Sequence, residues 1–211
     1  MRMLKITTSL VFVLVLSGFT LKPKKERVVE KTNQKQAVAY FASGCFWCVE
    51  AVFESVRGVK EAVSGYAGGH SRNPTYHSIG TGSTGHAEAV AVYYNPEVVS
   101  FQTLVDVFFG SQDPTTVNGQ HPDYGTQYRS IAFYQNAKEK EIIEHTIEKL
   151  NKEVYNGKIA TEVVKFTKFY KAEDYHQNYE RLHPDNPYVQ KVSIPRLNRF
   201  KRKFPHLLKD M

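Results

Sequence analysis

Hydrophobic and polar residues follow two periods along residues 37–182, and together they predict a mixed α/β domain. The stretch AVAYFAS at residues 37–43 is a short apolar run, which is typical of a buried strand. HAEAVAVYYNP at residues 86–96 alternates polar with apolar positions and stops at Pro96, as a half-buried strand does. In residues 100–111, Ser100 is a candidate N-cap and the apolar residues that follow recur at helical spacing up to Gly110.

The same pattern assigns the other elements. Further strands are expected within residues 59–69, 126–135 and 161–169, and further helices within 44–56, 136–157 and 172–182. Residues 71–85 and 111–125 are long loops rich in turn-forming residues, and loops of this length are usually functional or disordered. The residues after 183 are expected to be irregular. Since some strands are joined by loops and not by helices, we expect a two-layer α/β (α+β) sheet with packed helices.

The first residues form a separate segment. Arg2 and Lys5 precede the apolar run LVFVLVL at residues 10–16, which the small pair Ser17-Gly18 follows. This is the pattern of a secretory signal, and it is shorter than the roughly 20 residues that span a bilayer. We therefore assign residues 1–20 to a signal that is either cleaved or kept as an anchor, and residues 21–36 to a polar linker. The protein is then exported to the periplasm or the cell surface, with the N-terminal segment as its one membrane contact.

Charge is concentrated at the two ends of the chain. The net charge is +7 overall, but residues 32–189 alone carry −4. A nucleic-acid-binding protein would carry its positive charge on the folded domain and not only at the chain ends, so no nucleic acid is expected as a partner. We assign residues 37–190 to one catalytic domain and residues 191–211 to a basic, solvated C-terminal tail.

Both cysteines and the only tryptophan lie in GCFWCVE, residues 44–50. This heptapeptide joins a predicted strand to a predicted helix, with Cys45 in the first helical turn. Backbone N–H groups and the helix dipole at such a position lower the pKa of a thiol. Cys48 is one turn further on and could close a disulfide once Cys45 is oxidised.

Four interpretations of the cysteine pair remain open. A structural disulfide across two intervening residues would add little stability. A zinc site needs four ligands, and His70, His77 and His86 match no zinc spacing, so no metal is expected. A thiol–disulfide exchange or redox-sensing motif fits the strand-to-helix position. The fourth interpretation is a nucleophilic Cys45 in an aromatic pocket formed by Phe46 and Trp47, although those two rings could equally be core.

Three further residues could supply an acid and hydrogen-bond donors. Glu88 lies in an otherwise apolar strand, where loss of solvent would raise its pKa toward neutrality, or where it could simply face outward. Tyr76 in NPTYHS and Tyr128 in YGTQYRS follow turn-rich loops. Their hydroxyls could converge on one small polar atom, or the rings could serve packing alone.

Six segments in order make the chain resemble the A-type peptide methionine sulfoxide reductases, which act on the S epimer. The resemblance covers residues 37–188 and rests on GCFWCVE, SGYAGG, NPTY, TGHAEAV, DYGTQYRS and FYKAEDYHQNY. It implies the ferredoxin-like core of that family. It also implies that Cys45 attacks the sulfoxide sulfur of oxidised methionine in proteins or as the free amino acid, while Phe46 and Trp47 hold the methyl group.

The resemblance further implies that Glu88 donates a proton to the sulfoxide oxygen, with Tyr76 and Tyr128 around that oxygen and Asp123 beside the substrate. Cys45 is left as a sulfenic acid. Many relatives resolve it with cysteines in a C-terminal tail, and this tail has none. We therefore expect Cys48 to resolve it and a thioredoxin-like protein to reduce the Cys45–Cys48 disulfide, with no other cofactor. His176 and Gln177 belong to the same signature and are expected to be structural.

Overall fold

The computed structural model describes residues 36–210. The predicted signal, residues 1–20, and all of the predicted linker 21–36 except residue 36 lie outside the described residues. In chain order the strands are β1 (Ala37–Ala42), β2 (Val59–Ala67), β3 (Ala87–Tyr94), β4 (Gly119–Gln120), β5 (Asp123–Tyr124), β6 (Ile131–Tyr134), β7 (Glu162–Lys165) and β8 (Phe169–Lys171). The α-helices are α1 (Phe46–Glu54), α2 (Tyr76–Gly80), α3 (Phe101–Gly110), α4 (Ala137–Leu150), α5 (Tyr179–Leu182) and α6 (Ile194–Lys203).

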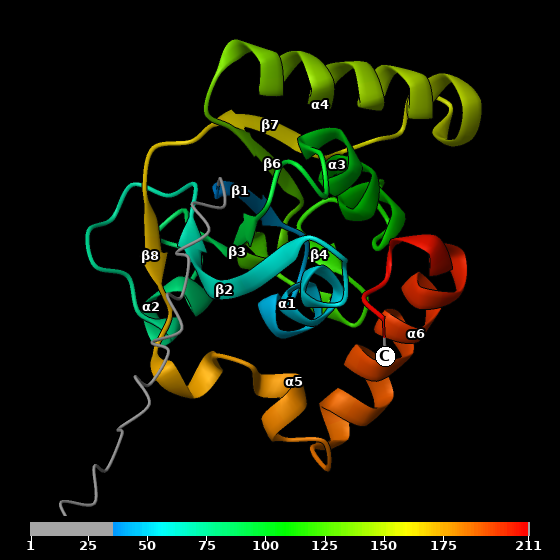
Figure 1. Cartoon of the computed structure of the whole chain (residues 1–211). Helices are drawn as coiled ribbons and strands as arrows, with labels where there is room; N and C mark the ends of the chain where they lie inside the picture. The colour runs from blue at the N-terminus through cyan, green and yellow to red at the C-terminus, as the bar shows by residue number, and fades with distance from the viewer. Residues whose placement is uncertain (1–35, 211) are drawn as a thin grey trace, which may run out of the picture. The chain divides into compact units, whose positions relative to one another are not determined.

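Six strands form one sheet in the order β7-β6-β1-β3-β2-β8, which is seen with its covering helices in Figure 1. The four central strands lie in the order β6-β1-β3-β2, and each neighbouring pair is antiparallel. Along the chain these strands and the two helices that connect them follow the order β1-α1-β2-β3-α3-β6. This is the β-α-β-β-α-β order of a ferredoxin-like core. β7 adds a parallel strand at one edge and β8 an antiparallel strand at the other. The expected α/β fold class is confirmed.

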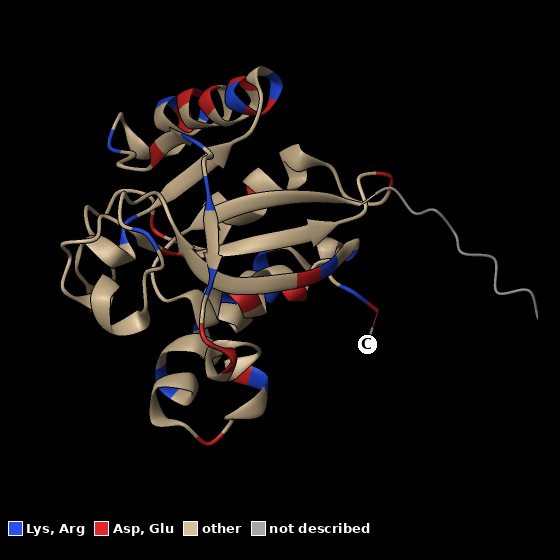
Figure 2. Cartoon of the chain, turned by 90° about the vertical axis from the view of Figure 1, so that its left-hand side faces the viewer, with Lys and Arg blue, Asp and Glu red and all other residues tan. Residues whose placement is uncertain are grey.

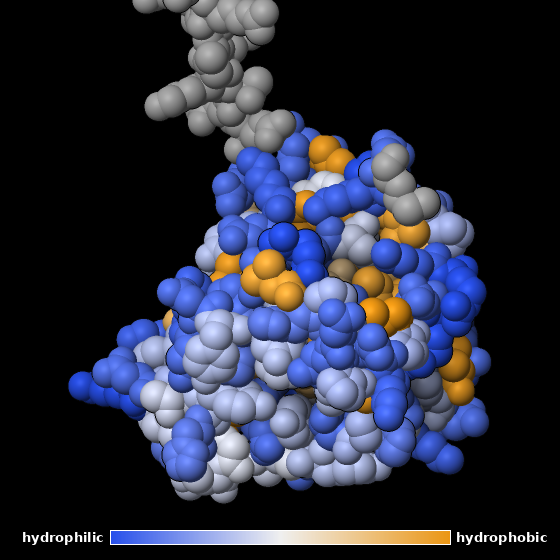
Figure 3. All heavy atoms as spheres, turned by 90° about the horizontal axis from the view of Figure 1, so that it is seen from below, coloured by the Kyte–Doolittle hydropathy of each residue, from blue (hydrophilic) through white to orange (hydrophobic). Residues whose placement is uncertain are grey.

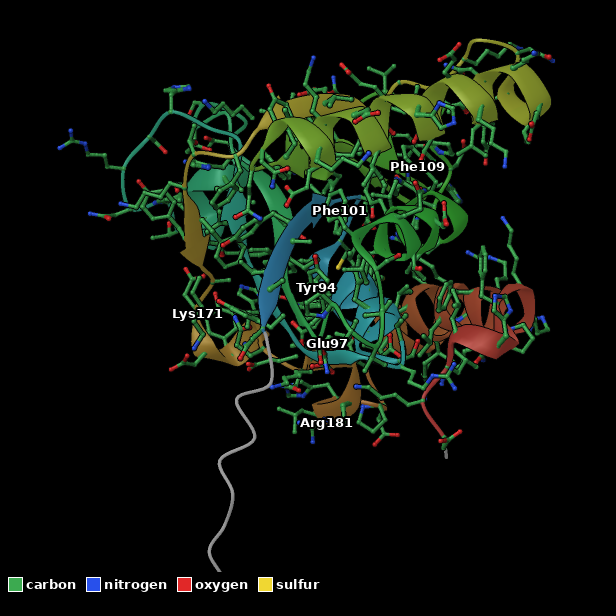
Figure 4. The ribbon with its side chains drawn as sticks, turned by 45° about the horizontal axis from the view of Figure 1, so that its top comes forward. Tyr94, Glu97, Phe101, Phe109, Lys171 and Arg181 are labelled. Carbon is green, nitrogen blue, oxygen red and sulfur yellow. The ribbon has the colours of Figure 1, made fainter. Side chains whose placement is uncertain are left out.

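Alternation along the strands divides the core into two parts. Ala39 and Phe41 of β1 face the helices and join the larger cluster, whereas Ala42 faces the other side with Ile131 and Phe133. The larger cluster includes Tyr94 at the end of β3 and the α3 residues Phe101 and Phe109, which Figure 4 labels together with the peripheral Lys171 and Arg181. Side chains two residues apart on a strand point to the same face of the sheet. Glu88 therefore faces the helices, together with Val90 and Val92.

Charged residues gather on the helices. Figure 2 shows alternating acidic and basic residues on α4, whereas the sheet is mostly uncharged. The face seen in Figure 3 is mainly hydrophilic with scattered hydrophobic side chains. Two helix starts have side-chain caps, of which Ser100 was predicted: the side chains of Ser100 and Asn136 accept hydrogen bonds from the N–H groups of Thr103 and Glu139. Within the described part of the chain, no helix is long and apolar enough to cross a membrane.

The C-terminal region differs from the irregular, solvated tail that we expected. A π-helical turn over Val189–Ser193 continues into α6, which contacts α1. Phe200 is 1% exposed and Arg196 is 8% exposed, so this helix covers the start of α1 and is not solvated throughout. Its many basic residues are typical of a surface tail, but its apolar side chains are buried against the rest of the domain.

Candidate active site

The backbone turns sharply just before the first cysteine. Gly44 has a φ of +78°, and a Cβ at this position would lie 2.6 Å from the Cβ of Gln120, so only glycine fits. The Gly44 N–H donates to the Tyr128 carbonyl at 3.1 Å. This bond fixes the segment carrying Tyr128 beside the segment carrying Cys45. The α1 helix then begins at Phe46, with Cys45 as its N-cap, one residue later than predicted.

Glu88 lies directly under the start of α1. Its side chain is 1% exposed, and its Oε2 accepts a hydrogen bond of 2.9 Å from the Phe46 N–H. Burial raises the pKa of Glu88 to about 8 and outweighs the lowering effect of the Phe46 hydrogen bond, while the charges of Asp123 and Cys48 raise the pKa by smaller amounts. The carboxyl group therefore keeps its proton at neutral pH, next to the backbone of Cys45.

The two thiols are buried and interact with each other. Burial, followed by the interaction with Cys48 and the charge of Glu88, raises the pKa of Cys45. The interaction with Cys45, together with Arg196, Ser193 and Tyr188, lowers the pKa of Cys48 to about 7. The expected lowering at Cys45 is absent because burial outweighs the helix start, whose first N–H is donated to Glu88. In this pair Cys48 is the more acidic thiol.

The two predicted tyrosines and Asp123 surround the same carboxyl group. Burial raises the pKa of Tyr76 to about 12, and after burial its largest contributions are the charges of Glu88 and Cys45. Burial and the same Glu88 charge raise the pKa of Tyr128. Asp123 accepts a hydrogen bond from the Tyr188 hydroxyl, and burial raises the pKa of Asp123. These mutual influences put the hydroxyls, the carboxyls and Cys45 in one small region.

Phe46 and Trp47 form the aromatic part of the site. The Phe46 ring is 1% exposed and lies 6.1 Å from the Tyr76 ring and 4.8 Å from the His176 ring. Trp47 is partly exposed and stacks on Tyr179 at 3.7 Å between ring centroids. The Trp47 indole N–H donates to Nδ1 of His176 at 3.2 Å. Phe46 is therefore a core residue that also contacts the aromatic rings of Tyr76 and His176, and Trp47 is held at the edge of the site.

The segment that holds Trp47 is itself anchored by two polar residues. The Gln177 side chain bonds both the N–H and the carbonyl of Ser64 in β2, at 3.0 and 3.1 Å. Buried Glu50 of α1 accepts hydrogen bonds from the Ser64 hydroxyl and the Asn178 N–H. Burial raises the pKa of Glu50 to about 7. His176 and Gln177 thus have supporting positions, as expected.

Sequence reasoning missed two residues that contact the cysteine region. The Tyr188 hydroxyl lies 3.9 Å from the Cys48 sulfur. Arg196 is held by hydrogen bonds from its guanidinium to the Ser43 carbonyl and hydroxyl and to the Ser111 carbonyl. Both come from the C-terminal region that we expected to be irregular. Tyr188 follows the turn pair Asn186-Pro187, which is the one local signal that could have marked it.

No metal-binding cluster is present among the described residues, since no group of three or more His, Cys, Asp or Glu side chains lies together there. The site can supply a pair of thiols, a protonated carboxyl group and two hydroxyls around an aromatic wall. This combination suits the protonation of a small oxygen atom and attack on the atom that bears it.

Residues 37–208 match the family model described as peptide methionine sulfoxide reductase. A peptide methionine sulfoxide reductase MsrA of Acinetobacter baumannii is 47% identical over 172 residues, covering 82% of this chain and 98% of the relative. The crystal structure of Mxr1 from Saccharomyces cerevisiae in reduced form has a TM-score of 0.69 and 32% identity, over 76% of this chain and 92% of that chain. Mxr1 in complex with Trx2 has a TM-score of 0.50 and 26% identity, over 72% and 91%.

Proposed function

The chain belongs to the peptide methionine sulfoxide reductase family, and we propose that Cys45 and Glu88 together reduce the S epimer of methionine sulfoxide, in proteins and as the free amino acid. The protein is an oxidoreductase that reduces methionine sulfoxide to methionine, and a thioredoxin-type protein regenerates its reduced form. The proposal adds which side chains carry out each step.

In the first step Cys45 attacks the sulfoxide sulfur while Glu88 protonates the sulfoxide oxygen. The S–O bond breaks, the protonated oxygen passes to the Cys45 sulfur, and the bond between the two sulfurs breaks, so that reduced methionine leaves and Cys45 becomes a sulfenic acid. The two electrons gained by the methionine sulfur come from the Cys45 sulfur. Cys48 is the more acidic thiol, so the enzyme enters the step with a Cys48 thiolate and a protonated Glu88. As Cys45 attacks, its proton passes to the Cys48 thiolate, which leaves Cys48 as a thiol.

In the second step Cys48 attacks the Cys45 sulfenic acid, which forms the Cys45–Cys48 disulfide and releases water. A thioredoxin-like dithiol then exchanges with this disulfide and becomes oxidised itself. Cys45 has φ −53° and ψ 122°, so its backbone is not yet helical. This conformation supports closure of the bond, because the first cysteine can move without unwinding α1.

Substrate is held by the aromatic and hydroxyl groups around Cys45. Phe46 and Trp47 take the methyl group, and the Tyr76 and Tyr128 hydroxyls donate to the sulfoxide oxygen. Hydroxyls whose pKa values are raised remain protonated donors throughout the neutral range. Asp123 accepts from Tyr188 beside the substrate and keeps that ring in place.

The observation that carries the proposal is the 2.9 Å hydrogen bond from the Phe46 N–H to Glu88 Oε2, because it sets a protonated carboxyl against the residue that follows Cys45. The test is turnover on separated S and R epimers of N-acetylmethionine sulfoxide. The wild type should reduce only the S epimer. Cys45→Ser should reduce neither, and Cys48→Ser should form at most one methionine per enzyme, more slowly than the wild type because the Cys48 thiolate is missing, and then stop.

Mass spectrometry after one turnover separates the alternatives for the oxidised form. The expected product has lost two hydrogens through the Cys45–Cys48 bond. A persistent sulfenic acid, or a disulfide between two chains, would rule out Cys48 as the resolving residue. Insulin reduction in parallel tests the thiol–disulfide exchange alternative, since activity there without sulfoxide turnover would refute the reductase assignment.

The compartment is also a proposal, and it rests on the signal pattern of residues 1–20. Export would make exported proteins with oxidised methionine the substrates and would leave the N-terminal segment as the membrane contact if it is not cleaved. N-terminal sequencing of the protein recovered from periplasmic and membrane fractions tests this. A start near residue 19 is expected after cleavage, and recovery in the cytoplasm would contradict export.

A further inference from the structure

A cleft of about 460 Å³ adjoins the reaction site on the side of Cys48. It runs between α6 and the loop that follows α3. Cys48, Asp123 and Tyr188 line both this cleft and the cysteine region described above. Its volume falls within the range of about 300–1,000 Å³ that is usual for ligand sites. The cleft therefore begins beside Cys48 and Asp123, next to the cysteine pair.

The α6 wall of the cleft is basic. Arg196, Arg199 and Lys203 all line it, and their spacing of three and four residues puts them on one face of the helix. Arg199 and Lys203 are exposed. Within residues 36–210 no ion pair joins any of the three to a carboxylate. Lys203 instead lies over the Phe204 ring, 5.4 Å from its centroid.

The opposite wall holds two carboxylates, and both are already engaged. Asp113 accepts hydrogen bonds from the N–H and the hydroxyl of Thr115, at 3.0 and 2.7 Å. Asp123 accepts from the Tyr188 hydroxyl. These bonds satisfy acceptor oxygens of the two carboxylates, whereas the Arg199 and Lys203 side chains of the basic wall have no carboxylate partner among the described residues.

Hydrogen-bond donors also remain at the bottom of the cleft. The guanidinium of Arg196 has five N–H groups, and its bonds to Ser43 and Ser111 use three of them. Arg196 is 8% exposed, and its charge acts on Cys48 and Asp123 without a direct ion pair. The buried Nε2 of Gln112, another lining residue, has no hydrogen-bond partner. Unused donors beside unpaired cations fit carboxylate oxygens.

We propose that this cleft receives the residues that flank an oxidised methionine in a substrate protein, and that the Arg199 and Lys203 wall favours substrates with Asp or Glu next to that methionine. The inference rests on the proposed function, because the flanking residues can enter the cleft only when the methionine is at Cys45. Both cations are solvent-exposed, so each pair formed with an acidic residue should have a modest effect, and two pairs together about three- to tenfold.

The test uses reduced enzyme in single turnovers, so that docking of a reductant cannot affect the rate. Peptides of one length carry one methionine sulfoxide flanked by Asp and Glu, by Asn and Gln, or by Lys. Each rate is divided by the same variant's rate on N-acetylmethionine sulfoxide, which has no flanking residues. The variants are R199Q/K203Q and a control, K191Q/R202Q, which removes the same charge from exposed residues outside the cleft.

The wild type at low salt should react with the acidic peptide about three- to tenfold faster than with the amide peptide, and 0.5 M salt should reduce this ratio. R199Q/K203Q should bring the ratio close to one, and K191Q/R202Q should retain it. A ratio near one in the wild type, or the same ratio in R199Q/K203Q, would overturn the inference. Failure of the proposed function would look different, because N-acetylmethionine sulfoxide would then not be reduced either.

Discussion

Replacing the buried Glu88 by glutamine should make the protein more stable while it removes most of its activity. Glu88 is 1% exposed, and its one hydrogen bond in the described structure accepts the Phe46 N–H. A glutamine side chain has almost the same shape, and its amide oxygen can accept the same bond. It carries no ionisable group, so the substitution isolates the contribution of the Glu88 proton to folding.

The magnitude follows from the two pKa values. Burial raises the pKa of Glu88 from 4.5 to about 8 on folding, so the folded protein holds a proton that the unfolded chain releases. The stabilising contribution of that proton is complete below pH 4.5 and is lost as the pH rises toward 8. At pH 7 the loss spans roughly 2.5 pH units at about 1.4 kcal/mol each, or about 3 kcal/mol. At pH 5 the same reasoning gives less than about 1 kcal/mol.

Thermal unfolding of the reduced protein, followed by circular dichroism, measures the effect. Glu88→Gln should raise the Tm by about 6–12 °C at pH 7 and by much less at pH 5. Its sulfoxide turnover should fall by about 10²- to 10⁴-fold, since a general acid is removed. Glu148→Gln, at an exposed position on α4, is the matched control and should change neither property. An equal Tm shift at both pH values, or a lower Tm at pH 7, would refute the reasoning.

Two further substitutions test the cysteine pair and its surroundings. Tyr188→Phe removes the hydroxyl that contacts Cys48 and Asp123. Disulfide formation between Cys45 and Cys48, measured in quenched single turnovers at pH 7, should slow by about two- to tenfold. An unchanged rate would show that the hydroxyl does not assist Cys48. Arg196→Met removes the cation that lowers the pKa of Cys48, so alkylation of Cys48 by iodoacetamide should move to higher pH; the same alkylation profile in both proteins would contradict it.

The central fold was predictable because its elements are long and regular. The strand at residues 37–42 and the helices at 101–110 and 137–150 have clear periods and side-chain caps. Within the two predicted loops, α2 has five residues and β4 and β5 have two each, which is too short for any period to register. α6 did carry a signal: Pro195 lies in its first turn, and Leu197 and Phe200 are three residues apart. Its many cations concealed that pattern.

The candidate site was predictable only where residues carry a motif. Parity along β3 explains why Glu88 faces inward, but the sequence alone did not say which face the helices would cover. The pKa order of the two thiols was the reverse of our expectation, because burial and the positions of Glu88 and Arg196 depend on tertiary contacts. Tyr188 and Arg196 reach Cys48 from more than 130 residues away, and no local pattern encodes such an approach.

The most direct test of the account is the pH dependence of the first turnover, from pH 5 to 10, with reduced enzyme and N-acetylmethionine S-sulfoxide in a rapid-quench instrument. The account requires a Cys48 thiolate and a protonated Glu88, so the rate should be highest between about pH 7 and 8 and fall on both sides. Glu88→Gln should lose the decline on the alkaline side. A wild-type rate that keeps rising through pH 9 would contradict the claim that a protonated Glu88 drives the reaction.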